Sequence, residues 1–380
     1  MSSISDSAER TVGNGVAINP PRLRIVVGRW LMFSDYGAAA QRHMAIVWSC
    51  VLGCALADAV WLPNSRLSFA SSNWTDLLQG IACCALTGAL IAVASSRLRS
   101  DAGYPAVVLR TALTITELLW RAALPFGALL TAGATLSYLI AAADLPLQDA
   151  LLARVDRNLG FDWLRFLDTT NSSPFLAALL ARVYQTVGLV AQLVIVWLAL
   201  NRRGERLAEL IAILSLSTVG LCVGMWLVPA AGAFAYYGPA PQLVENFSAL
   251  GEMWSFAHAF TMLRNGSLSV IDLSALQGVV SFPSFHTMLG VMTIYALRDT
   301  RWLMIPILLL NGAMIVSTLP VGGHHLADVL AGAGLTFGAI LLVRRRTSFQ
   351  TRSQDLATAK KPSVRKPGQA PLGDGTEPLV

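Results

Sequence analysis

Long apolar runs separated by short polar segments dominate the middle of the chain. Eight runs approach or reach the length needed to cross the roughly 30 Å hydrocarbon core of a bilayer as helices. They lie at 44–62, 77–96, 122–143, 183–200, 207–228, 284–297, 302–319 and 325–343. We therefore predict an all-α, polytopic membrane helical bundle with about eight transmembrane helices. Segment 104–121 is more polar and is predicted as an interfacial lead-in to the third helix.

Composition supports the membrane class. The 380 residues are 54% hydrophobic and only 13% charged, whereas a soluble domain carries about twice that charged fraction. The predicted organisation is a cytoplasmic N-terminal segment at 1–43, a membrane domain at 44–343 and a disordered, basic cytoplasmic tail at 344–380.

The placement of positive charge predicts the orientation of the bundle. The net charge is +6, and arginines gather in alternate loops, such as "NRRGER" (201–206), "RDTR" (298–301) and "RRR" (344–346). Positively charged loops face the cytoplasm, so both termini should be cytoplasmic, with segments 144–182 and 229–283 outside. Because topology accounts for the basic charge, we expect no nucleic-acid partner.

Histidines cluster at the predicted outer ends of two helices. The chain has five, and His286, His324 and His325 lie at such ends. His324 and Asp328 are spaced i, i+4, which places them on one helical face. A carboxylate there can hold one imidazole nitrogen and leave the other free to attack. Two alternative interpretations of these residues are a His–Asp pair that only holds two helices together and a zinc site formed by His286, His324 and Asp328.

The stretch "SFPSFHTMLG" (281–290) begins a predicted helix with polar residues. Pro283 suits a first helical turn. Ser284 can present a hydroxyl beside free backbone N–H groups that favour an anion, and His286 can donate a proton to a leaving oxygen. The alternative is an N-cap followed by a solvated histidine.

These two stretches resemble signatures of the type 2 phosphatidic acid phosphatase (PAP2) superfamily. "FPSFH" (282–286) is similar to its Pro-Ser-Gly-His signature, and "STLPVGGHHLAD" (317–328) is similar to Ser-Arg-x5-His-x3-Asp. The resemblance covers about 145–343 and comes nearest to the branch of inositol phosphorylceramide synthases and their bacterial relatives. Weaker similarities lie in "DRNLGFDW" (156–163), "LVPAAGAFAYYG" (227–238) and "MLRNG" (262–266).

The resemblance implies a PAP2-type six-helix core and a role for each matching residue. His324 would be the nucleophile that forms a phosphohistidine, with Asp328 as its orienting partner. His286 would protonate the leaving group and then act as base for the acceptor. Ser284 and Ser317 would bind phosphate oxygens. The implied reaction needs no metal and no cofactor.

Two basic positions of the family pattern are missing. Thr318 stands where the signature has arginine, and the Lys-x6-Arg-Pro signature has no counterpart. Phosphoryl transfer needs positive charge around the equatorial oxygens, so other arginines must supply it. Arg264 and Arg182 are the candidates, followed by Arg157; the alternative for Arg264 is a solvated loop charge.

The predicted function is therefore cleavage or exchange of a phosphoester on a lipid phosphate or phospholipid. The acceptor is water, which makes a phosphatase, or a polyol or lipid alcohol, which makes a phosphotransferase. The expected location is a bacterial inner membrane with the site on the periplasmic face, where aromatic segments 145–176 and 229–282 would select the acceptor. The alternative from another class is a non-catalytic scaffold or transporter with a PAP2-like fold.

Overall fold

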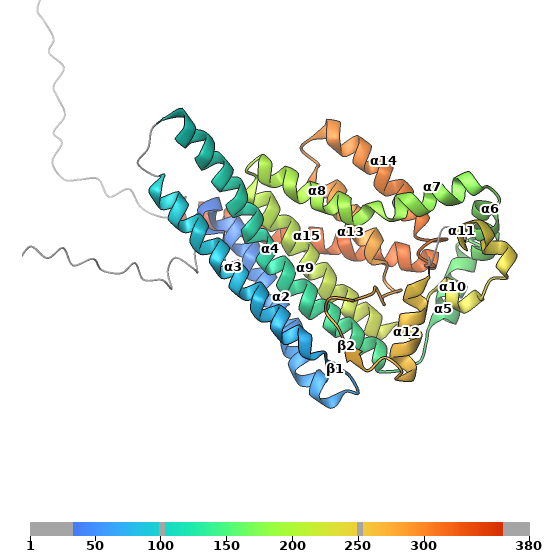
Figure 1. The fold of residues 1–380 in the computed structure, drawn as a ribbon. Helices are drawn as coiled ribbons and strands as arrows, with labels where there is room; N and C mark the ends of the chain where they lie inside the picture. Colours follow the sequence, from blue (N-terminus) through green and yellow to red (C-terminus); the bar gives the residue numbers. More distant parts are fainter. Residues whose placement is uncertain (1–32, 99–102, 249–253, 360–380) are drawn as a thin grey trace, which may run out of the picture.

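The computed structural model describes residues 33–98, 103–248 and 254–359. Helices make up nearly all the regular structure of these residues (Figure 1). The strands found among them, β1 (Ser68–Phe69) and β2 (Val270–Ile271), pair in parallel over two residues. The predicted all-α membrane bundle is confirmed.

Six helical stretches of the described chain are long and apolar enough to cross a membrane. They are α2 with the 3-10 turn η2 (Gly37–Trp61 and Leu62–Asn64), α3 (Ser71–Arg97), α4 (Tyr104–Ala142), α7 with α8 (Pro174–Tyr184 and Thr186–Leu200), α9 (Gly204–Leu227) and the first part of α15 (Leu326–Ala359).

Two further apolar helices are shorter, α13 (Phe285–Ala296) and α14 (Arg301–Ser317). All eight predicted runs are thus helical. At 1.5 Å per residue, however, α13 is only about 18 Å long and α14 about 26 Å, less than the roughly 30 Å hydrocarbon core.

Some element bounds differ from the prediction. Segment 104–121, predicted as a lead-in to the third helix, is continuous with that helix and forms the first part of α4. α2 begins at Gly37, before the predicted boundary at 44, and α15 continues to Ala359, beyond the boundary at 343. This extension contains neither proline nor glycine to end the helix. Residues 1–32 and 360–380 of the two predicted terminal segments lie outside the described residues.

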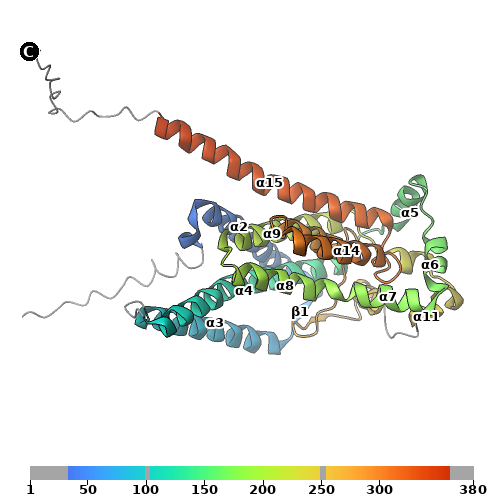
Figure 2. The same cartoon turned by 90° about the horizontal axis from the view of Figure 1, so that it is seen from above.

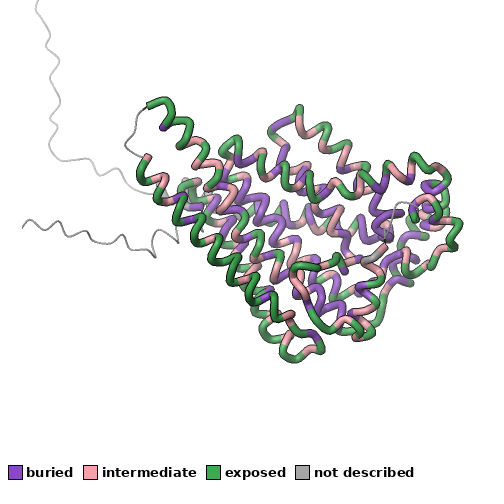
Figure 3. Tube along the Cα trace, in the orientation of Figure 1, coloured by how far each residue is buried: buried purple, intermediate pink, exposed green. Residues whose placement is uncertain are grey.

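The centre of the bundle is a continuous apolar core. Helices α2, α4 and α9 pack against one another, and α13 lies among α8, α9, α14 and α15. Buried positions follow these central helices, whereas the outer faces of α2 and α3 are largely exposed (Figure 3). Among the exposed side chains on α3 are Leu78, Ile81, Leu86 and Leu90. An apolar exposed face of this extent suits contact with lipid.

Short helices cover one end of the bundle. The short elements of this part of the described chain are α5 (Asp149–Asn158), α6 (Trp163–Asn171), α10 (Ala233–Tyr237), η3 (Pro241–Val244), α11 (Glu245–Ser248) and α12 (Ser255–Asn265). The 3-10 turn η1 (Ser34–Tyr36) instead precedes α2, and Tyr36 packs against Gly204 at the start of α9. Both views place α5, α6 and α11 together at one end (Figures 1 and 2). A separate apolar cluster there includes Trp163, Phe247 and Val321. Val321 precedes the histidine pair, so this end carries the candidate site.

Candidate active site

His324 and Asp328 meet at the start of α15. His324 Nδ1 lies 3.2 Å from Asp328 Oδ2, and both side chains are buried. The pair does not lie on one helical face as predicted, because α15 begins at Leu326 and His324 precedes it. Since a carboxylate only accepts hydrogen bonds, Nδ1 carries the hydrogen in this arrangement and Nε2 keeps its lone pair.

Asp328 Oδ2 accepts two further hydrogen bonds. The Ser281 hydroxyl donates from 3.2 Å, and the backbone N–H of His325 donates from 2.9 Å. Together with His324, three donors thus converge on one carboxylate oxygen. Such bonds fix the position of the carboxylate.

The start of α13 is tied to the same place. Ser284 is the N-cap residue, and its hydroxyl accepts from Thr287 N at 3.5 Å. Its own backbone N–H donates to the Asp328 carbonyl at 3.0 Å. Pro283 therefore precedes the N-cap instead of occupying the predicted first turn. A Cβ at Gly332 would lie 2.5 Å from the Ser284 carbonyl oxygen, so glycine is required there for α15 to approach α13 this closely.

His286, in the first turn of α13, stacks on Tyr184 from the end of α7. Their ring centroids are 4.3 Å apart, at an interplanar angle of 19°. A Cβ at Gly322 would lie 3.1 Å from Tyr184 Cε2 and 2.9 Å from His324 Cδ2. Tyr184 thus stacks on His286, and Gly322 lies between Tyr184 and His324. The two imidazoles also interact electrostatically. The structure brings His286, His324, Asp328 and Ser284 together from two helices.

His325 turns away from this group toward α5. Its Nδ1 lies 3.2 Å from Asp156 Oδ2, and its Nε2 lies 3.5 Å from Asp149 Oδ1. All three side chains are buried. Asp156 also accepts from the backbone N–H groups of Leu326 and Ala327, at 3.1 and 2.9 Å. A carboxylate from α5 therefore caps the N-terminus of α15, where the helix dipole favours negative charge.

This environment favours the charged form of His325. Burial acts against the imidazolium, but hydrogen bonds and charge from Asp149 and Asp156, with a further contribution from Asp328, outweigh it and raise the pKa of His325 to about 9. The imidazolium then links two carboxylates of α5, seven residues apart. From the sequence, His325 was predicted only to flank the site, whereas in the structure it forms ion pairs with Asp149 and Asp156.

Two of the three segments with the weaker family similarity meet the loop between α14 and α15 that carries His324 and His325, here called the histidine loop. From "DRNLGFDW", Asp156 binds the start of α15 and Trp163 Nε1 donates to Leu319 O at 3.1 Å. From "LVPAAGAFAYYG", the backbone N–H of Phe234 donates to Gly323 O at 3.3 Å. "MLRNG" reaches only the end of α4, through Arg264. Two of the three segments thus support the histidine loop directly.

The predicted phosphate-binding residues are more dispersed. Arg264 Nη2 lies 2.7 Å from Asp144 Oδ1 and donates to Leu145 O at 2.9 Å, so these contacts are at the end of α4. Arg182 is exposed on α7. Ser317 is fully buried, and its hydroxyl donates to Met314 O at 2.6 Å. Within the described part of the chain, Arg264, Arg182 and Ser317 form no hydrogen bond or ion pair with His324 or His325.

Sequence reasoning missed four residues of the assembly. Ser281 and Tyr184 carry no signal that separates them from ordinary residues near a helix end. Asp149 and Asp156 do carry one, because a spacing of seven residues is two helical turns and places both carboxylates on one face. In the described residues, no group of three His, Cys, Asp or Glu side chains is arranged to hold a metal ion.

Comparison with known proteins gives one result. A family model described as the PAP2 superfamily matches residues 150–342, half of the chain. The match begins in α5 and ends in α15, so it includes Asp156, Ser284, His286, His324 and Asp328. Searches among curated proteins and solved structures found no match.

Proposed function

Because the chain belongs to the PAP2 superfamily, we propose that it cleaves a lipid phosphoester in the membrane through a phosphohistidine on His324. PAP2 proteins are generally phosphatases, and membership indicates an enzyme of that kind. The observation that carries this proposal is the 3.2 Å contact of His324 Nδ1 with the buried Asp328 carboxylate, beside His286. This contact leaves Nε2 as the attacking atom.

In the first step, the lone pair of His324 Nε2 attacks phosphorus while the bond from phosphorus to the ester oxygen breaks. Positive charge develops on the imidazole, and Asp328 stabilises it through Nδ1–H. His286, protonated, gives its proton to the departing alkoxide. The products are a phosphohistidine, a neutral His286 and a free alcohol.

In the second step, neutral His286 removes a proton from the acceptor. The acceptor oxygen attacks phosphorus, the phosphorus–nitrogen bond breaks, and its electron pair returns to His324 Nε2. A water acceptor releases inorganic phosphate, or a phosphomonoester if the enzyme-bound group carries a substituent. An alcohol acceptor gives a new phosphoester. The same residues serve both outcomes.

Phosphate oxygens need donors during both steps. We assign Ser284 to this role because it begins α13 beside the helix N-terminus, where backbone N–H groups favour an anion. Ser317, Arg264 and Arg182 are the further proposed phosphate ligands. To bind a phosphate oxygen, Arg264 must first release its ion pair with Asp144.

The resemblance to the inositol phosphorylceramide synthase-like branch makes an alcohol acceptor the first to test, either a polyol or a ceramide-like lipid. Aromatic side chains near the histidine loop fit an apolar acceptor: Phe234 and Trp254 stack at 4.1 Å, and Phe234 adjoins Gly323. We place the site at the periplasmic face of a bacterial inner membrane, with both termini cytoplasmic, on the basis of the arginine-rich loops. Labelling of Arg264→Cys from the outside tests this orientation.

The decisive experiment offers the purified protein a panel of lipid phosphates and phosphoinositides, with and without alcohol acceptors. The wild type is compared with His324→Ala and with His258→Ala, a control at an exposed histidine of α12. Labelled substrate should give an acid-labile, base-stable phosphoenzyme in the wild type and in His258→Ala only. Turnover that survives His324→Ala would exclude the mechanism.

The same experiment separates the alternatives. Release of inorganic phosphate without a second product indicates a phosphatase, and a new lipid phosphoester indicates a transferase. Loss of turnover on chelation, with turnover restored by zinc, would favour the metal site. A folded protein with no turnover on any substrate would favour the scaffold or transporter.

A further inference from the structure

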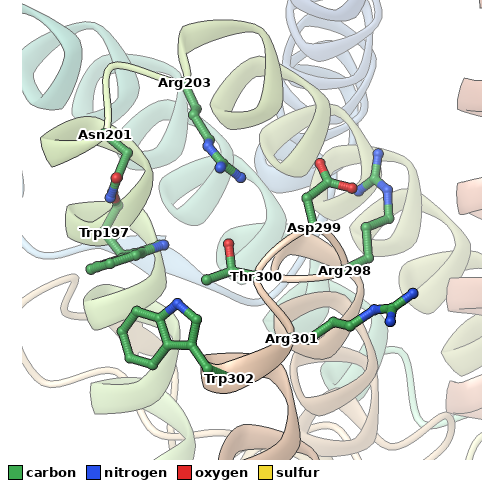
Figure 4. Close-up of a pocket in the computed structure, with 8 residues that line it drawn as sticks. All are labelled: Trp197, Asn201, Arg203, Arg298, Asp299, Thr300, Arg301 and Trp302. Atoms are coloured by element: carbon green, nitrogen blue, oxygen red, sulfur yellow. The ribbon is translucent and has the colours of Figure 1, made fainter.

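A pocket of about 900 Å³ lies far from the histidine loop. Its lining residues come from the end of α8 and the α8–α9 connection, and from the turn between α13 and α14 and the start of α14 (Figure 4). They are Trp197, Asn201, Arg203, Arg298, Asp299, Thr300, Arg301 and Trp302. α13 runs from Ser284 toward this turn and α14 returns toward His324, so the pocket and the candidate active site lie at opposite ends of these helices.

The pocket has an excess of positive charge. Its lining includes three arginines and one aspartate. Two of these four are neutralised: Arg298 Nη2 donates to both carboxylate oxygens of Glu209, at 2.9 and 2.6 Å, and Asp299 pairs with Arg206. For Arg203 and Arg301, no carboxylate partner is found within the described ranges.

Two tryptophans form the apolar side of the pocket. Trp197 and Trp302 pack edge to face, with ring centroids 5.4 Å apart. Trp302 is 66% exposed, and beyond it Ile305 and Leu309 on α14 are also exposed. The buried Trp197 Nε1 has no hydrogen-bond partner in the described structure. Tryptophan beside arginine is typical of the boundary between hydrocarbon and lipid headgroups.

Helix ends add to the positive character of the pocket. α9 begins at Gly204, next to Arg203, and α14 begins at Arg301. Neither helix has a side-chain cap on its first turn. The positive ends of both helix dipoles therefore lie beside the guanidinium groups of Arg203 and Arg301.

We propose that this pocket binds an anionic phosphate group, supplied by a membrane lipid headgroup or by free phosphate. Arg203 and Arg301 contact the phosphate oxygens, since a guanidinium group suits bidentate recognition of phosphate. Trp197 Nε1 donates to another ligand oxygen, and Trp302 packs against the apolar part of a lipid. The ligand joins the α8–α9 connection to the start of α14.

Thermal unfolding of the purified protein in neutral detergent tests this proposal. A ligand that binds only the folded state raises the Tm with its concentration. The probes are phosphatidylglycerol, zwitterionic phosphatidylcholine and inorganic phosphate, each titrated separately. We expect the Tm to rise with phosphatidylglycerol and not with phosphatidylcholine.

The double variant Arg203→Gln, Arg301→Gln should need about 30-fold more phosphatidylglycerol for the same rise, because two arginine–headgroup interactions are lost. The control is Arg97→Gln, at an exposed arginine of α3 outside the pocket. It should respond as the wild type does. The single variant Arg301→Gln, at an exposed position, keeps the test valid if the double variant folds poorly.

Each outcome is decisive. A rise caused by inorganic phosphate and lost in the arginine variants supports the site and assigns free phosphate as the source. Equal responses of wild type, arginine variants and Arg97→Gln would overturn the proposal, as would equal responses to phosphatidylglycerol and phosphatidylcholine.

Discussion

His325 Nδ1 lies 3.2 Å from Asp156 Oδ2, and the same carboxylate accepts from the first two backbone N–H groups of α15. This contact joins α5 to the helix that carries Asp328, across 169 residues of sequence. The next residue toward the N-terminus is His324, the proposed nucleophile. We therefore propose that Asp156 positions His324 for the proposed reaction, through the backbone of the histidine loop.

Asp156→Ala should lower both stability and activity. The substitution removes one of the two carboxylates that face the buried His325 and the acceptor of the Leu326 and Ala327 backbone N–H groups. Breaking a buried ion pair costs about 3–5 kcal/mol, and Asp149 limits the loss. Asp168→Ala, at an exposed position on α6, is the matched control and should be close to neutral. The measurements are the Tm and kcat on the substrate identified by the lipid panel. An Asp156→Ala protein with wild-type Tm and kcat would show that the cap is dispensable.

Stability should fall at alkaline pH because of His325. Its pKa is raised to about 9 in the folded protein, from about 6.5 in an unfolded chain. The charged imidazole therefore stabilises the fold fully below pH 6.5, and this contribution is lost as pH rises through 9. By linkage it amounts to about 3 kcal/mol. Charge from Asp149, Asp156 and Asp328 maintains it, beside the rings of Tyr236 and Tyr237.

The measurement is Tm between pH 6 and pH 10 for the wild type and for His325→Gln. The wild-type Tm should drop across the upper part of this range. The variant should be less stable at neutral pH and change less with pH. Parallel curves for the two proteins would contradict the assignment.

Local patterns indicated the candidate site residues but not the contacts that support them. Apolar runs gave the positions of eight helices because burial in lipid depends on local composition. The four-residue spacing of His324 and Asp328 predicted that their side chains meet, and they do, although α15 begins after His324. The partners of His325 could not be derived in the same way, because they depend on how α5 docks against α15, which is a long-range contact.

The lengths of α13 and α14 show a second limit. Hydropathy marks an apolar segment, but a helix ends where capping and tertiary contacts end it. Ser284 fixes the start of α13 through its bond with Thr287, so the polar residues before it lie outside the helix. The distribution of basic charge also gave only part of the result. Both "NRRGER" and "RDTR" were predicted to lie on the same side of the membrane, but only the fold shows that Arg203 and Arg301 line one pocket.

Ser281→Ala should slow the chemical step while leaving the fold intact. The Ser281 hydroxyl donates to Asp328 Oδ2, the oxygen that also holds His324. Loss of a hydrogen bond to a charged group costs about 1.5–3 kcal/mol, so we expect kcat to fall by roughly ten- to a hundredfold. KM should change little. Ser248→Ala, at an exposed position at the end of α11, is the control. An unchanged kcat in Ser281→Ala would remove Ser281 from the site.

A double-mutant cycle of Arg264→Gln and Asp144→Asn separates two roles for Arg264. If its pairing with Asp144 is its only role, each single variant and the double variant should lose the same, small amount of stability, about 0–1 kcal/mol for a solvent-accessible pair. If Arg264 binds substrate phosphate as proposed, Arg264→Gln alone should reduce kcat/KM at least tenfold and Asp144→Asn should not. Equal kcat/KM in both single variants would exclude the proposed role.

Two glycines of α15 provide the sharpest structural test of how the site is assembled. A Cβ at Gly332 would lie 2.5 Å from the carbonyl oxygen of Ser284, whereas a Cβ at Gly334 would have no atom within 4 Å. Gly332→Ala must push α13 and α15 apart, at a cost of about 1–3 kcal/mol for overpacking. Gly334→Ala should instead stabilise the helix by about 0.5–1 kcal/mol.

Because Ser284 N also bonds to the Asp328 carbonyl, separation of these helices should disturb the arrangement of His286 relative to His324. We therefore expect the kcat of Gly332→Ala to fall by more than the fraction of protein that its lower Tm leaves unfolded at the assay temperature. Gly334→Ala should keep wild-type kcat. Thermal unfolding and steady-state kinetics on the same preparations check both expectations, and an active Gly332→Ala protein with wild-type Tm would show that the close approach of α15 to Ser284 is not needed for the site.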